Sequence, residues 1–128
     1  MARTRIARAD GEVAVQATLD GVSDRDVLAV AVRYLLQLLS DAAPGNALEV
    51  RVPPYGAAQV VEGPRHTRGT PPNVVEMDAA TWLALATGSL RWDEALATHR
   101  VSASGSRADL TPHLPLAWAP PTGGMMNL

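Results

Sequence analysis

Apolar and polar residues alternate along the chain with two different periods, and together these predict an α+β domain. The longest apolar stretch, residues 24–41, carries its polar residues at steps of three, four or seven, which is the spacing of a helix. The polar positions form one narrow stripe: Asp26, Arg33, Gln37 and Ser40. The pattern predicts a helix over about 24–41. Ser23 and Asp26 resemble a capping box at its start, and Pro44-Gly45 follows its end.

The predicted helix 24–41 is apolar over more of its circumference than a surface helix requires. Such a helix buries an apolar arc of a little over 100°, whereas here nearly everything outside the polar stripe is apolar. The surplus face needs a second contact. Three alternatives are open: a second packed helix, which residues 11–19 could form, a ligand cavity, or a dimer interface.

Shorter apolar runs predict a small sheet. Alternation of apolar and charged residues over 47–52 is typical of a strand with one solvent-facing side. The run Pro53-Pro54-Tyr55-Gly56 predicts a turn, so that 57–62 returns antiparallel. After a loop over 63–72, further strands are expected at 73–77 and 100–105.

Two more helices are expected between the last two strands. Asp78 is placed to cap a helix that runs to Thr87, and Gly88 is placed to end it in a left-handed conformation. A short helix follows over about 90–98. A single helical turn is expected near 109–114.

Length and composition indicate a single domain over residues 1–128. We expect a frayed N-terminus over 1–9 and a proline- and glycine-rich tail over 117–128, with Trp118 docked on its own domain. The absence of cysteine excludes disulfides, thiol nucleophiles and cysteine-based metal sites. The three histidines are scattered, with no partner at the spacing of a metal site, so no metal and no cofactor are expected.

Charge does not point to a macromolecular partner. The formal net charge is -2, and all 11 basic residues are arginine, so nothing favours nucleic acid or an anionic membrane surface. No apolar stretch reaches the roughly 20 residues of a membrane span, and the basic start lacks the apolar core of a secretory signal. We therefore expect a cytoplasmic protein.

The loop over 62–73 holds three cationic or titratable side chains between glycines and prolines. Arg65, His66 and Arg68 could present a rigid site for a carboxylate or phosphate, because guanidinium groups match these anions with paired hydrogen bonds. Alternatively, the arginines pair with nearby acidic residues, Glu62, Glu76 or Asp78, and hold the loop against the sheet.

Two tryptophans lie on the apolar faces of the two short helices. Trp82 and Leu85 are three residues apart on the first, and Trp92 and Leu96 are four apart on the second. Such residues are commonly core. They would also suit the wall of an apolar pocket, and both interpretations are kept.

The second half of the chain resembles the sterol-carrier-protein-2 family. The resemblance rests on four segments in order. They are a strand ending in Asp (73–78), a helix ending at Gly (81–88), a helix with a central Ala (92–96) and a strand ending at Gly (100–105). Val52-Pro53-Pro54-Tyr55-Gly56 and the run from Glu62 to Glu76 are similar to an actinobacterial branch of short sterol-carrier-like proteins, the bacterial orthologues of the carrier. The resemblance covers roughly 47–116.

This resemblance implies an α+β fold in which a curved mixed sheet of about five strands has helices packed on one face. It also implies an apolar tunnel that accepts fatty acyl chains, sterols or other lipids. The first functional hypothesis is therefore non-catalytic binding or transfer of a lipid-like ligand, with its anionic head at Arg65, His66 and Arg68. The expected apolar pocket residues are Leu35, Leu38, Leu39, Val60, Trp82, Leu85, Trp92 and Trp118.

Two other hypotheses belong to different classes. The chain could be an accessory domain that works through a protein partner or a homodimer, because similar modules resemble the C-terminal domains of certain mycothiol-dependent enzymes. It could also be an enzyme acting on a small substrate, with His66 as general base backed by Glu62.

Overall fold

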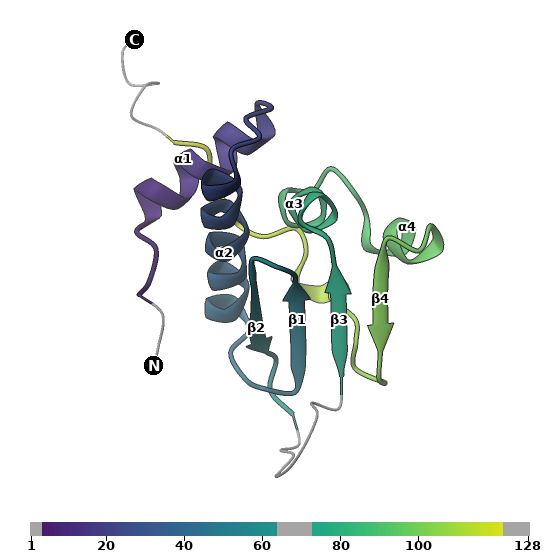
Figure 1. Cartoon of the computed structure of the whole chain (residues 1–128). Coiled ribbons are helices and arrows are strands. Elements are labelled where there is room, and N and C mark those ends of the chain that lie inside the picture. Colours follow the sequence, from purple (N-terminus) through teal and green to yellow (C-terminus); the bar gives the residue numbers. More distant parts are fainter. Residues whose placement is uncertain (1–3, 64–72, 122–128) are drawn as a thin grey trace.

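A computed structural model describes residues 4–63 and 73–121, and it has an α+β architecture (Figure 1). The elements lie close to the predicted ranges, with ends shifted by up to three residues. In chain order they are α1 Arg8–Leu19, α2 Arg25–Ala42, β1 Leu48–Val52, β2 Gly56–Val60, β3 Val74–Met77, α3 Ala79–Thr87, α4 Trp92–Ala97, β4 Val101–Ser104 and the short 3-10 helix η1 Thr111–His113.

Helix α2 begins one residue later than a Ser23 cap would give. The N-cap is Asp24, whose side chain accepts hydrogen bonds from the backbone amides of Asp26 (2.8 Å) and Val27 (3.1 Å). The predicted capping box at Ser23 is therefore wrong. A carboxylate at the N-cap satisfies the same unpaired amides and also interacts favourably with the helix dipole.

Helix α1 packs against α2 and covers much of its surplus apolar face. Of the three alternatives for that face, the second packed helix is the one confirmed. The ring of Tyr34 on α2 lies against Gly11 of α1, and Val15 of α1 is fully buried. The opposite side of α2 lies against β2 and α3.

The described strands form one mixed sheet in the order β2-β1-β3-β4. Strand β1 pairs antiparallel with β2 and parallel with β3, and β3 pairs antiparallel with β4. The described residues thus contain four strands instead of the expected five or so. The mixed sheet and the α+β class agree with the prediction.

The helices lie on one face of this sheet, as expected. Alternate residues of β1 point inward, so that Leu48, Val50 and Val52 are fully buried, whereas Glu49 and Arg51 between them are half-buried. The same alternation places Val75 and Met77 of β3 inside and Glu76 outside. One sheet face is therefore core and the other is polar.

Helices α3 and α4 connect β3 to β4, as Figure 1 shows. Asp78 caps α3 by accepting a hydrogen bond from the Thr81 amide at 2.8 Å, and Gly88 ends the helix with a φ of 93°. Both features were predicted. Trp82 of α3 is fully buried, and its indole N–H donates to the Val32 carbonyl of α2 at 3.2 Å.

Residues 4–9 differ from the frayed end expected over 1–9, of which residues 1–3 lie outside the described residues. Helix α1 begins at Arg8, and residues 5 and 6 are hydrogen-bonded to α2. At the other end of the described chain, Trp118 is half-buried against the core, as expected for a ring docked on its own domain. Residues 122–128 of the predicted tail lie outside the described residues.

Candidate functional site

An apolar hollow, here called the α3–α4 cleft, lies between the two short helices and the segment that follows η1. Its volume is about 300 Å³. Leu116 donates its backbone N–H to the Ala86 carbonyl at 2.9 Å, which fixes the C-terminal segment against α3. The lining residues are Leu85, Gly88, Leu90, Arg91, Trp92, Asp93, Thr111, Leu114 and Pro115.

The charged residues of the α3–α4 cleft are at its rim. The guanidinium of Arg91 lies 3.1 Å from the carboxylate of Asp93, and both side chains are more than two-thirds exposed. An ion pair this exposed contributes little to stability. Both groups can therefore turn toward a ligand at the rim with little loss.

A wider and more polar hollow, here called the α1–α2 hollow, lies where α1, α2 and the segment near Ala117 meet. Its volume is about 580 Å³. The Glu12 carboxylate is largely buried and accepts a hydrogen bond from Arg8 at 2.9 Å. Burial raises the pKa of the Tyr34 phenol, and the negative charge of Glu12 adds to this shift. Leu38 and Ile6 supply apolar surface.

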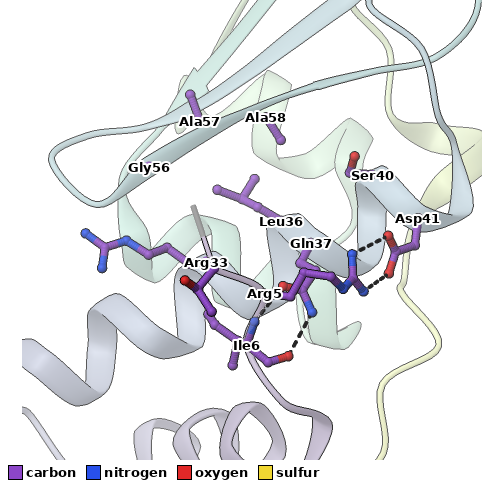
Figure 2. A pocket seen from close by; sticks show the side chains of 11 residues that line it. Arg5, Ile6, Arg33, Leu36, Gln37, Ser40, Asp41, Gly56, Ala57 and Ala58 are labelled. Atoms are coloured by element: carbon purple, nitrogen blue, oxygen red, sulfur yellow. Dashed lines mark hydrogen bonds and ion pairs between the residues drawn. The ribbon is translucent and has the colours of Figure 1, made fainter. Parts of the chain in front are cut away.

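A third hollow, here called the edge groove, lies between α2, the start of β2 and residues 4–6 (Figure 2). Its volume is about 260 Å³. Arg33 donates its Nε–H to the Tyr55 carbonyl at 2.7 Å. The hydrogen bonds between Arg5 and Asp41 raise the pKa of Arg5 and lower that of Asp41. Leu36, Ser40 and residues 56–58 complete the walls.

The eight apolar residues predicted to line a pocket are distributed over different places. Leu85 and Trp92 come together in the α3–α4 cleft, and Leu38 lines the α1–α2 hollow. Trp118 packs against the core. The other four are fully buried in the core: Leu35, Leu39, Val60 and Trp82. Leu85 and Trp92 are also buried core residues, although they border the cleft.

The predicted anion-binding residues Arg65, His66 and Arg68 lie outside the described residues. His66 is also the general base of the catalytic hypothesis, so the described residues do not test that hypothesis either. Of the acidic side chains suggested as their partners, Glu62 and Glu76 are exposed and Asp78 caps α3. The head-group assignment therefore stays a prediction.

Sequence reasoning missed the C-terminal wall of the α3–α4 cleft. Leu114 ends the helical turn predicted near 109–114 and Pro115 follows it, and no local pattern shows that the two residues return to α3. It also missed the partner of the polar stripe on α2. The sequence identifies Gln37 as polar, but its partner Ile6 lies 31 residues away along the chain.

Neither a metal centre nor a membrane helix is found in the part of the chain that the structure describes. No three His, Asp or Glu side chains of residues 4–63 and 73–121 lie close enough to hold a metal ion. None of the described helices is long and apolar enough to cross a membrane.

The described residues form an α+β domain with a four-stranded mixed sheet, α2 packed against β2 and α3, and a hollow beside α3 and α4, which is consistent with a domain of the sterol-carrier type. The family model described as bacterial SCP ortholog matches residues 24–116, from the cap of α2 to the segment that closes the α3–α4 cleft. The chain therefore belongs to this family of bacterial sterol-carrier-like proteins. A search of curated proteins gives no match.

Proposed function

We propose that the protein binds a lipid-like ligand without catalysing a reaction, and that the ligand's apolar part enters the α3–α4 cleft. One observation carries the proposal. Leu85 and Trp92, two residues predicted to line a lipid pocket, lie together in a hollow with Leu90 and Leu114. Membership in a family of sterol-carrier-like proteins supports the same class of function.

The size of the α3–α4 cleft limits the ligand. Its volume of about 300 Å³ is at the lower end of the range of about 300–1,000 Å³ that small-molecule sites occupy. Each methylene group buried there contributes about 0.8 kcal/mol. A medium-length acyl chain is therefore the occupant that we propose. A longer chain or a sterol requires Leu114 and Pro115 to move away from α3.

The polar end of the ligand has two candidate positions. Arg91 lies at the rim of the α3–α4 cleft, beside Asp93. The loop with Arg65, His66 and Arg68 is the position given by the first hypothesis from the sequence. Alanine substitutions at Arg91 or at the loop residues distinguish the two positions. Only substitutions at the position that binds the carboxylate should weaken binding of a fatty acid more than binding of the corresponding alcohol.

Titration with decanoic acid tests the proposal. Trp92 lies in the cleft, so bound ligand should change tryptophan fluorescence. Leu90→Gln places an amide at the wall of the cleft and should weaken binding about tenfold, the equivalent of about 1.4 kcal/mol. The matched control is Leu96→Gln on the exposed side of α4, where the side chain is 38% exposed. Unchanged affinity in Leu90→Gln would exclude this cleft.

Native mass spectrometry of the gently purified protein gives an independent readout. A co-purifying lipid-sized mass that is lost on denaturation supports the carrier function. Absence of both an adduct and any response to decanoic, myristic and oleic acids contradicts it.

A second candidate function is that of an interaction domain. Three apolar side chains are exposed on α1 and the turn after it: Val13 at 56%, Leu19 at 45% and Val22 at 43%. Exposed apolar side chains mark some protein interfaces when they form a continuous patch. Light scattering over a range of concentrations tests for a homodimer, and Val13→Asp should then give a monomer. A monomer at every concentration that also captures no partner contradicts this function.

A further inference from the structure

The most specific polar recognition in the described chain lies on α2 and binds the chain's own N-terminal segment. Gln37 accepts a hydrogen bond from the Ile6 amide and donates one to the Ile6 carbonyl, both at 2.9 Å. A neighbouring β-strand makes the same pair of bonds to one residue. Gln37 therefore holds the backbone of Ile6 as a strand would.

The residue before Ile6 is also recognised. Asp41 lies one helical turn after Gln37 and accepts two hydrogen bonds from Arg5, at 3.1 Å from Nη1 and 2.7 Å from Nη2. Paired bonds between a guanidinium and a carboxylate require one relative orientation and select arginine over lysine. Figure 2 shows both contacts side by side on α2. The Ile6 side chain packs against the core and adds an apolar requirement.

The space around this segment is larger than the segment itself. Arg5, Ile6 and Gln37 line both the edge groove on one side and the α1–α2 hollow on the other. Residues 5 and 6 thus border two hollows, of about 260 and 580 Å³. A bound segment longer than two residues has room on either side.

The ion pair that holds Arg5 is exposed enough to be exchanged. The Arg5 side chain is 67% exposed and that of Asp41 is 47% exposed. An ion pair at this exposure is screened by water and salt. Residues 5–6 nevertheless have a high effective concentration at this site, because they belong to the same chain.

We propose that the face of α2 carrying Gln37 and Asp41 is a docking site for an extended peptide segment in which arginine directly precedes a branched aliphatic residue such as isoleucine. Residues 5–6 are its intramolecular occupant. They compete with a segment of the same chemistry on a partner protein. This site is separate from the α3–α4 cleft and does not depend on lipid binding.

The test uses a fluorescein-labelled, amidated peptide with the sequence Thr-Arg-Ile-Ala-Arg, which is that of residues 4–8. Its binding to the full-length protein is followed by fluorescence anisotropy. The double variant Arg5→Ala/Ile6→Ala removes the two side chains that occupy the site. It should bind the peptide at least tenfold more tightly than the original protein, because residues 5–6 no longer compete. Adding Asp41→Ala or Gln37→Ala to that variant should abolish the gain, and 0.5 M salt should weaken binding.

The control peptide exchanges the arginine and the isoleucine, which keeps composition and charge. It should bind at least tenfold more weakly. Arg5→Ala alone leaves the packing of Ile6 in place and serves if the double variant is not folded by circular dichroism. The proposal is overturned if neither variant binds the peptide better than the original protein, or if the two peptides bind equally.

Discussion

The aromatic ring of Tyr34 on α2 lies directly against the α-carbon of Gly11 on α1. A β-carbon at position 11 would overlap three atoms of the ring. Gly11 is itself buried, and Tyr34 is only 4% exposed. The two helices therefore approach closely at this point because one of them has no side chain there, and this contact helps α1 to cover α2.

Gly11→Ala should destabilise the protein even though alanine is the better helix former. The gain in helix propensity is about 1 kcal/mol, whereas an extra carbon forced into a filled contact costs about 1–3 kcal/mol. The overlap is with a ring held between two helices, so we expect a net loss of about 1–2 kcal/mol. Urea unfolding measures it. Val13→Ala on the exposed side of α1 is the control and should change stability by less than about 0.5 kcal/mol.

The cap of α2 gives a second prediction, because sequence and structure assign it to adjacent residues. Asp24→Ala removes the acceptor for the amides of Asp26 and Val27 and should lower the free energy of unfolding by about 0.5–2 kcal/mol. Ser23→Ala should have almost no effect. Thermal unfolding of the two variants decides between the assignments, and a larger loss in Ser23→Ala would restore the capping box.

Much of the fold could be predicted because its signals are local. Periodicity marked α2 and the strands, and the Asp78 and Gly88 signals fixed both ends of α3. The surplus apolar face of α2 even required a partner such as α1. Strand order could not be obtained in this way, because the parallel pairing of β1 with β3 depends on the whole connection between them.

The candidate site was harder to predict, because a hollow forms where segments that are distant in the sequence meet without filling the space between them. Leu35, Leu39 and Trp82 have the same apolar character as Leu85 and Trp92, and all five are buried, yet only the last two border the α3–α4 cleft. The difference is set by η1 and Leu114, which lie far along the chain. Hydrophobicity identified apolar side chains but not which of them would border a cavity.

The indole of Trp82 provides a third prediction. Its N–H donates to the Val32 carbonyl at 3.2 Å in a fully buried position. Trp82→Phe loses this hydrogen bond and leaves a small cavity, so we expect a loss of about 2–3 kcal/mol. Trp118→Phe, at a half-buried position, should cost less than about 1 kcal/mol. Denaturant unfolding compares the two, and equal losses would show that Trp82 does not hold α3 to α2.

Acid stability should depend on the cap of α3. The hydrogen bond from the Thr81 amide lowers the pKa of Asp78 below its usual 3.8, with smaller contributions from the Thr81 hydroxyl and the charge of Arg100. The unfolded chain then takes up the proton at a higher pH than the folded chain. The contribution of this carboxylate is therefore complete well above pH 3.8 and is lost as the pH falls through the lowered pKa of the folded state.

Asp78→Asn separates the charge of this cap from its geometry. Asparagine keeps an acceptor for the Thr81 amide, so stability at pH 7 should change less than in Asp78→Ala, which should lose about 0.5–2 kcal/mol. Both variants should lose less stability than the original protein between pH 5 and pH 3, since neither has a carboxylate to protonate. Asp41 and Asp109, whose pKa values are also lowered by hydrogen bonds, remain in all three proteins. Urea unfolding at each pH measures the difference, and parallel pH profiles for Asp78→Asn and the original protein would show that protonation of Asp78 does not destabilise the fold.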